Sequence, residues 1–148
     1  MITPLNLPKA PLDLTKSEGV VYVHCLIRKK KLVLTPEEWV RQHVIHFLNQ
    51  NGIPMGLMGV EVALKYHERS KRADVVVFGM DQKPKLIVEC KAPEIELSEA
   101  VFRQIASYNY VLKVDFLMMT NGRDHIYAKI DHENGNLEFL KNLPQMEV

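Results

Sequence analysis

The chain has 148 residues, 47% hydrophobic and 25% charged, a balance typical of one folded domain with a buried core. Nineteen Lys and Arg residues oppose 18 Asp and Glu residues, and the net charge of +1 excludes a protein that binds nucleic acid by bulk positive charge. Two cysteines are too few for a disulfide framework, no apolar run could span a bilayer, and the proline-broken N-terminus lacks a secretion signal. We therefore expect a single domain, residues 1–148, in a reduced, cytoplasmic, soluble protein without membrane contact.

The first third of the chain predicts an arm, a hairpin and a helix. Residues 1–19 are rich in proline and lack periodicity, which predicts an extended N-terminal arm. Val20–Ile27 and Lys31–Leu34 are β-rich runs on either side of a basic turn, the pattern of a hairpin. Thr35–Glu38 begins a helix, with an N-cap, a proline at the first helical position and acidic residues in the first turn. Asn51-Gly52 ends this helix with a left-handed cap.

The rest of the chain predicts three strands, a second helix, a further strand and a closing hairpin. Val60, Val62 and Leu64 alternate along the first strand and should share one face, and the basic turn Arg69–Arg72 should precede the second strand. The second helix should bury residues that include Val101. These elements are expected at 59–66, 73–78, 85–91, 98–111, 116–120, and 125–130 with 137–140. A meander followed by a helical crossover gives an α/β fold, a mixed sheet flanked by helices with a hairpin at each end.

Two of the predicted strands break their apolar pattern with ionisable residues. Asp74 interrupts the second strand, and Glu89 and Lys91 interrupt the third. Side chains alternate across a strand, so Glu89 and Lys91 project from the same face, and Asp74 lies on the preceding strand within pairing distance. Two carboxylates and one ammonium leave an excess negative charge that a divalent metal ion would neutralise. Because Mg²⁺ prefers carboxylates together with water and phosphate oxygens, the pattern favours a metal-dependent phosphodiester-cleaving site.

A structural ion pair at a strand end is the alternative explanation of the same residues, since charged residues often lie there. The hairpin placement of the strands and the flanking helices favour the functional explanation. Glu61, on the polar face of the first strand, is either a further acidic ligand or a salt-bridged strand residue. Cys90 points to the sheet face opposite Glu89 and Lys91, which predicts a core thiol rather than a nucleophile.

The arrangement of Asp74 and Glu89-Cys90-Lys91 resembles the D…(D/E)xK motif of the PD-(D/E)xK nuclease superfamily. Over most of the chain, a core of about residues 34–130, the sequence is similar to the N-terminal nuclease domain of type I restriction enzyme R subunits. The similarity is carried by Thr35–Gln42, Arg72–Asp74, Val88–Pro93, Gln104–Tyr108 and Thr120–Gly122. The resemblance implies the restriction-endonuclease-like αβββαβ core.

The resemblance also implies a role for each matching strand position. Asp74 and Glu89 would be metal ligands, with the backbone carbonyl of Cys90 as a third ligand. Mg²⁺ or Mn²⁺ would be the cofactor. Lys91 would be the catalytic lysine.

Helical residues complete the site that the resemblance implies. A glutamate of the first helix would be a further metal ligand; Glu37 and Glu38 both qualify, and Glu37 is preferred because it shares the helix face that carries apolar residues. Gln104 and Tyr108, one turn apart on the second helix, would face the site and position the lysine or the DNA backbone. The candidates for phosphate contacts are Arg69, Lys71 and Arg72.

Two departures from the family pattern change what is expected. Ala73 stands where the family usually has proline before the aspartate. No Walker A motif is present, and 148 residues leave no room for the helicase-like motor of R subunits, so a restriction role would require a separate translocase or modification subunit. DNA is the expected partner, and a homodimer is compatible with nucleases of this type.

Two principal functions fit these observations. The first is a Mg²⁺-dependent nuclease domain that hydrolyses DNA phosphodiester bonds. The alternative is a catalytically silent module with a nuclease fold, which binds nucleic acid or a partner subunit. The near-zero net charge and the missing motor favour the silent module, whereas the intact Asp74, Glu89 and Lys91 favour the enzyme. A scaffold protein in which these three residues form a buried ion pair is a third, weaker alternative.

Overall fold

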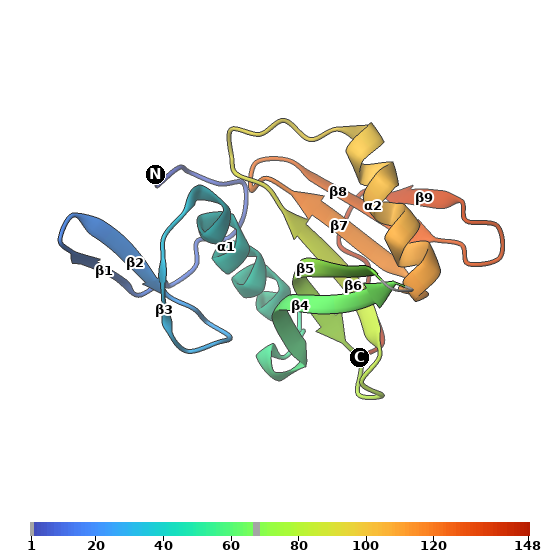
Figure 1. The fold of residues 1–148 in the computed structure, drawn as a ribbon, viewed down its shortest axis with the longest axis horizontal. Helices are drawn as coiled ribbons and strands as arrows, with labels where there is room; N and C mark the ends of the chain where they lie inside the picture. Colours follow the sequence, from blue (N-terminus) through green and yellow to red (C-terminus); the bar gives the residue numbers. More distant parts are fainter. Residues whose placement is uncertain (1, 67–68) are drawn as a thin grey trace.

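One six-stranded sheet carries a helix on each face (Figure 1). The structure, a computed structural model, describes residues 2–66 and 69–148, apart from the side chains of Tyr66 and Arg69. The elements of this part are α1 (Pro36–Gln50), a 3-10 helix (Met55–Leu57), β4 (Met58–Tyr66), β5 (Arg69–Phe78), β6 (Pro84–Cys90), α2 (Glu99–Leu112), β7 (Phe116–Thr120), β8 (His125–Ile130) and β9 (Leu137–Leu140). The strands follow chain order across the sheet, and all neighbours are antiparallel except β6 and β7, which α2 connects.

The two helices bury separate apolar faces against this sheet. On one face Val44 of α1 belongs to the same cluster as Val88 of β6. On the other face Phe102 of α2 belongs to the same cluster as Ile87, the neighbouring residue of β6. Each such side chain contributes about 1.5–3 kcal/mol when it leaves water. Because β6 is covered on both faces, its sequence is a nearly continuous apolar run, and Glu89 at its end is the exception.

Both helices begin where the sequence predicts. The Thr35 hydroxyl accepts the Glu38 N–H at 3.0 Å, and the Ser98 hydroxyl accepts the Val101 N–H at 3.3 Å. These side chains satisfy amides that the first turn of a helix leaves without partners. In the part of the chain that the structure describes, no helix is both long and apolar enough to cross a membrane.

The N-terminal segment is more ordered than the extended arm predicted for residues 1–19. Residues 14–17 form a strand, because Glu18 and Gly19 both adopt positive φ angles, 51° and 80°, and close a two-residue hairpin. The sequence did not indicate this turn, since glutamate is uncommon at the first position of such a turn. The resulting three-stranded antiparallel sheet lies beyond α1 in Figure 1 and consists of β1 (Leu14–Ser17), β2 (Val20–His24) and β3 (Lys31–Val33).

The predicted α/β class and mixed sheet are confirmed, with local corrections. The basic segment Arg69–Arg72 is not a turn, because it extends β5 and pairs with the end of β4. Val101 does not face the core, since it is 38% exposed, and Phe102 is fully buried in its place. A helix start in which both positions are apolar leaves the buried face ambiguous by about one residue.

Glu61 interrupts the regular alternation of β4. Its φ angle of 52° lies in the left-handed region, and the ladder between β4 and β5 skips the pair of Glu61 and Asp74. Val60, before this point, packs on the α1 side of the sheet, whereas Val62 packs on the α2 side. The prediction that Val60 and Val62 share one face is therefore wrong. A non-glycine residue in this conformation costs of order 1–3 kcal/mol and often marks a functional site.

Candidate metal-dependent active site

The ladder between β5 and β6 stops where the predicted metal ligands begin. Its last regular pair joins Val75 and Val88, and the same register continued by one residue would place Asp74 opposite Glu89. The Oδ2 atom of Asp74 accepts the N–H of Cys90 at 2.7 Å, in place of a backbone carbonyl. The carboxylate thus satisfies an amide that the parting strands would leave bare, and this bond fixes its position beside Glu89.

The other edge of β6 stays paired to its end and holds the motif in place. The Lys91 N–H donates to the carbonyl of Thr120 at 2.8 Å. Asn121 then ties the following loop, because its amide donates to the carbonyl of Ile95 at 2.8 Å. The N–H of Gly122 donates to the hydroxyl of Thr120 at 2.8 Å and closes the turn. The Thr120–Gly122 turn therefore supports the backbone of Lys91.

Glu89 has a cation of its own. The Nζ atom of Lys71 lies 2.5 Å from Oε1 of Glu89, and it also lies 5.0 Å from the ring centre of Tyr108 on α2. Among the described residues, the ammonium group of Lys91 makes neither a hydrogen bond nor an ion pair. The pairing of Glu89 with Lys71 was missed from the sequence, because the two residues are 18 positions apart and the segment of Lys71 was expected to be a turn.

Asp74 is held in a position that disfavours its ionised form. Burial raises the pKa of its carboxyl group to about 6, and the negative charges of Glu89 and Glu37 act in the same direction. The Cys90 N–H and the Arg41 guanidinium act in the opposite direction but do not compensate. A carboxylate that is destabilised in this way gains from a divalent cation placed beside it.

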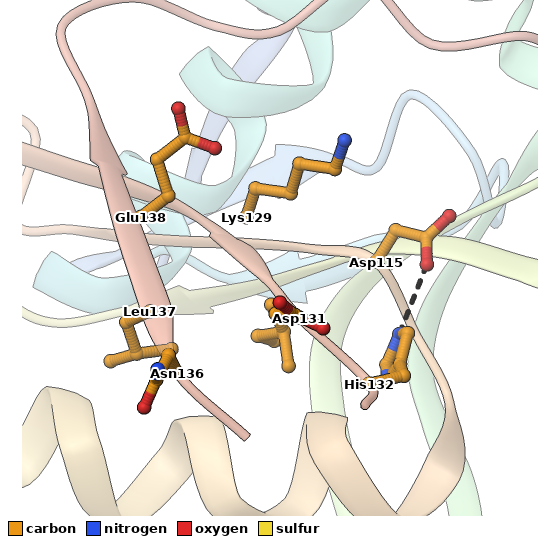
Figure 2. Close-up of a pocket in the computed structure, with 8 residues that line it drawn as sticks. Asp115, Lys129, Asp131, His132, Asn136, Leu137 and Glu138 are labelled. Carbon is orange, nitrogen blue, oxygen red and sulfur yellow. Dashed lines mark hydrogen bonds and ion pairs between the residues drawn. The ribbon is translucent and has the colours of Figure 1, made fainter. Parts of the chain in front are cut away.

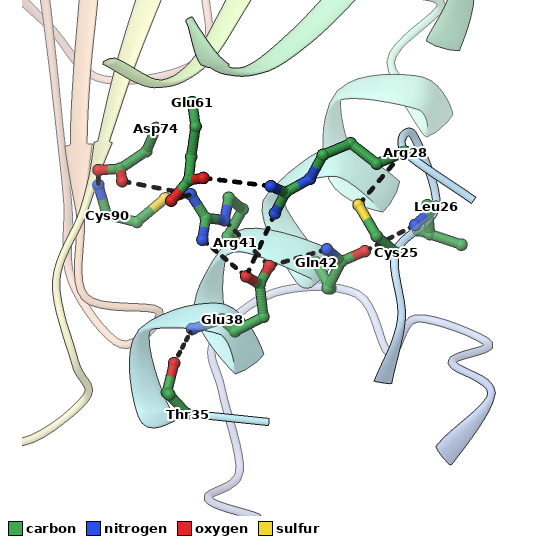
Figure 3. Close-up of polar contacts among 10 residues, drawn as sticks. All are labelled: Cys25, Leu26, Arg28, Thr35, Glu38, Arg41, Gln42, Glu61, Asp74 and Cys90. Carbon is green, nitrogen blue, oxygen red and sulfur yellow. Dashed lines mark hydrogen bonds and ion pairs between the residues drawn. The ribbon is translucent and has the colours of Figure 1, made fainter. Parts of the chain in front are cut away.

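Arg41 of α1 links Asp74 to the helix (Figure 3). Its Nη1 atom lies 3.5 Å from Oδ1 of Asp74 and 3.6 Å from Oε1 of Glu61. Its Nε and Nη2 atoms donate to both carboxylate oxygens of Glu38, at 2.9 and 2.6 Å. Sequence reasoning missed this arginine as a site residue, although a charged residue on the buried face of a helix, three positions after a glutamate, is the available signal.

Glu38 lies at the centre of this network, and its carboxylate is already engaged rather than available to a metal ion. Burial acts to raise the pKa of Glu38, but the hydrogen bonds from Arg41 and Gln42 outweigh it and the pKa is lowered. Arg28, from the β2–β3 connection, lies 3.7 Å from Glu38 and 3.1 Å from Glu61, so Figure 3 shows the small sheet tied to α1 and β4 by charges. The network therefore fixes α1 relative to Asp74.

The first-helix glutamate preferred from the sequence, Glu37, lies on the exposed side. Glu37 is exposed, whereas Glu38 is 4% exposed and fully engaged with arginines. The negative charge of Glu37 acts to raise the pKa of Asp74. Whether either carboxylate completes a metal site stays a prediction, and Glu37 is the one with an uncommitted carboxylate.

The other predicted contact residues divide between two elements. On α2, the ring of Tyr108 lies beside Lys71, the partner of Glu89, while Gln104 is exposed. On β5, Arg72 is exposed and available to a ligand. The side chain of Arg69 lies outside the described residues. Tyr108 is thus linked to Glu89 through Lys71, whereas the side chain of Gln104 makes no contact with the acidic residues in the described part of the chain.

A pocket lies at the end of the strands opposite to Asp74 and Glu89, and Figure 2 shows the residues that line it. Its volume is about 520 Å³, and it is formed around the β8–β9 hairpin and Asp115, which precedes β7. The Nε2 atom of His132 lies 3.0 Å from Oδ1 of Asp115 and occupies that carboxylate. Since Cys90 and Thr120 form the last pair of β6 and β7, the motif residues lie at the other end of these strands.

Comparison with known proteins gives one match. Residues 36–144 match the family described as Type I restriction enzyme R protein N terminus (HSDR_N). The chain belongs to this family. No protein of curated function and no solved structure matches it. The match covers the whole large sheet and both helices, so the opening at Asp74, the Glu89-Cys90-Lys91 strand and the Thr120–Gly122 turn all lie within the family region.

The donor groups at the opening fit a hard divalent cation of the kind that a restriction nuclease family implies. Asp74 and Glu89 offer two carboxylates on adjacent strands, and the carbonyl of Cys90 follows Glu89 directly. Within the described residues, no three His, Cys, Asp or Glu side chains form a ready metal cage. Mg²⁺ does not need one, because it binds through one or two carboxylates with water and substrate oxygens. The raised pKa of Asp74 marks the charge that such an ion would neutralise.

The buried network predicts unequal roles for the two glutamates of this family member's first helix. Glu38→Gln removes the charge that holds Arg41 and should lower the free energy of unfolding by about 2–4 kcal/mol. Glu37→Gln, at an exposed position, should change it by less than about 0.5 kcal/mol. Urea denaturation of both variants at pH 7.5 measures the difference, and equal losses would contradict the assignment.

The raised pKa of Asp74 predicts a pH-dependent stability difference in the metal-free protein. Above pH 6 the folded state holds an ionised buried carboxylate, whereas between pH 6 and about 4 it binds a proton that the unfolded chain does not. Relative to Asp74→Asn, the wild type should therefore become more stable as pH falls through this window, by about 1.4 kcal/mol per pH unit. Denaturation curves in EDTA at several pH values test this; a difference that stays constant from pH 7.5 to 5 would refute it.

Proposed function

We propose that this chain is a Mg²⁺- or Mn²⁺-dependent nuclease domain that hydrolyses phosphodiester bonds of DNA. The observation that carries the proposal is the opening between β5 and β6, where the Asp74 carboxylate replaces a ladder carbonyl next to Glu89. Membership of the type I R protein N-terminal family supports the proposal, since the opening lies within the matched residues. In a scaffold, a partly buried Asp74 carboxylate with a raised pKa, on the strand next to that of the buried Glu89, would cost stability.

Each residue of the motif has a distinct task in this proposal. Asp74 and Glu89, with the Cys90 carbonyl, would hold the metal ion. The ion would polarise the scissile phosphate and lower the pKa of a bound water. Lys91, whose ammonium group has no partner among the described residues, orients the attacking water and stabilises the added negative charge on the phosphate in the transition state. The bond that breaks joins phosphorus to an ester oxygen of the DNA backbone.

Helix α2 and the extended β5 would guide the substrate. Tyr108 lies beside Lys71, the partner of Glu89, and Gln104, one turn earlier, is exposed where DNA backbone could approach from solvent. Arg72 is exposed on β5 and would contact a phosphate, as would Arg69. We infer that a separate translocase or modification subunit directs the domain to its target in the cytoplasm, and that DNA is its common partner.

The alternative is a catalytically silent binding module, and one observation favours it. Both carboxylates already have partners, since Cys90 and Arg41 contact Asp74 and Lys71 contacts Glu89. A silent module would keep these internal pairs and bind no metal ion. The enzyme would exchange at least one of them for a divalent cation. The two functions therefore differ in metal binding even before any cleavage is measured.

Cleavage of linear, circular and single-stranded DNA in Mg²⁺ or Mn²⁺ tests the enzyme directly. Lys91→Ala should lower the rate by roughly 10²–10³-fold, because it removes a charge aimed at the transition state. Lys85→Ala is the matched control: Lys85 lies at the other end of β6 and pairs with Asp81, so its loss should leave the rate unchanged. EDTA should abolish cleavage.

Two results would contradict the proposal. Equal rates for wild type and Lys91→Ala would exclude the assigned lysine. Absence of cleavage by the wild type, together with absence of metal binding that depends on Asp74, would favour the silent module.

A further inference from the structure

Lys71 neutralises Glu89 in the metal-free protein. Its Nζ atom lies 2.5 Å from Oε1 of Glu89, and the two side chains are only 17% and 11% exposed. An ion pair largely removed from water is costly to leave half-made. A metal ion that binds Glu89 must therefore displace the Lys71 ammonium, and the displaced charge must find a new partner.

Lys71, and not the motif lysine, fills this position. Lys71 lies on β5, three residues before Asp74, and belongs to the segment that extends the strand beyond its predicted start. In the described part of the chain, the Lys91 side chain has no ion pair, although Lys91 directly follows the strand that carries Glu89. The site thus contains one engaged and one free ammonium group.

Tyr108 keeps the displaced ammonium near the site. Nζ of Lys71 lies 5.0 Å from the centre of the Tyr108 ring, within the range of a cation–π contact. A lysine side chain has a flexible four-carbon stem, so its ammonium group can turn from Glu89 toward solvent while its methylene groups stay against the ring. A divalent ion carries twice the charge and prefers carboxylate oxygen, so it competes effectively for Glu89.

We propose that Lys71 and the divalent metal ion compete for Glu89, and that the released Lys71 ammonium then binds a phosphate oxygen of the DNA backbone. This inference rests on the proposed nuclease function and adds a coupling between its two ligands. Without metal, Lys71 is engaged internally and contributes nothing to DNA binding. With metal, it supplies one phosphate contact, so metal and DNA increase each other's affinity.

Metal titration by calorimetry provides the first test. Mn²⁺ is titrated into the full chain, without DNA, for wild type and Lys71→Gln. Removing the competing ammonium should increase Mn²⁺ affinity about three- to tenfold. Lys65→Gln is the matched control, since it removes the same charge from an exposed position of the same β4–β5 hairpin, and it should bind Mn²⁺ as the wild type does. Lys71→Arg, which keeps the charge, should also resemble the wild type.

DNA binding provides the second test. All proteins carry Lys91→Ala to prevent cleavage, and binding of a short duplex is measured over a range of salt concentrations. In Mg²⁺, Lys71→Gln should weaken binding and reduce the slope of log affinity against log salt by about one. In EDTA, the same substitution should have no effect, because Lys71 is then held by Glu89.

The outcomes separate this inference from the proposed function. If the wild type binds Mn²⁺ through Asp74 but Lys71→Gln binds it no more tightly, the competition is refuted and the nuclease proposal stands. An equal loss of DNA affinity in EDTA and in Mg²⁺ would also refute it, because Lys71 would then be an ordinary phosphate contact. If the wild type binds no Mn²⁺, the proposed function fails, and this inference fails with it.

Discussion

The hydrogen bond from the Cys90 amide to the Asp74 carboxylate is the interaction on which the rest of the site depends. It ends the β5–β6 ladder without leaving a bare amide, and it places a buried carboxylate beside Glu89. Meanwhile β6 stays paired with β7 as far as Lys91 and the Thr120 carbonyl, so only one edge opens. An opening of this kind, inside a sheet covered on both faces, gives the acidic residues fixed positions that a surface loop would not provide.

The surrounding cationic side chains stabilise this opening, but they do not fully neutralise the Asp74 carboxylate. Arg41 approaches Asp74 but gives its two best hydrogen bonds to Glu38, and Lys71 pairs with Glu89. The pKa of Asp74 is accordingly raised by burial despite these neighbours. Cationic side chains therefore hold the acidic residues in place without fully neutralising their negative charge. The remaining negative charge is the physical basis for expecting a divalent cation in this family member.

The sequence predicted the parts of this structure that depend on local patterns. The caps at Thr35 and Ser98, and the strand that carries Glu89 and ends just before Lys91, follow from residue types at short spacing. The features it missed depend on tertiary contacts: Lys71 is a strand residue because β5 extends to pair with the end of β4, and Arg41 is a site residue through Glu38. The left-handed conformation of Glu61 could not be predicted either, because glutamate has no intrinsic preference for it.

We propose that Asp74 and Glu89 bind one divalent ion across the opening between β5 and β6. A crystal of the protein grown with Mn²⁺, measured for anomalous scattering, tests this most directly. We expect a single strong anomalous peak bound by both carboxylates and the Cys90 carbonyl, with the Lys71 ammonium moved away from Glu89. A map with no peak there and an intact Lys71–Glu89 pair, or a peak only at the distant pocket beside Asp115, would contradict it.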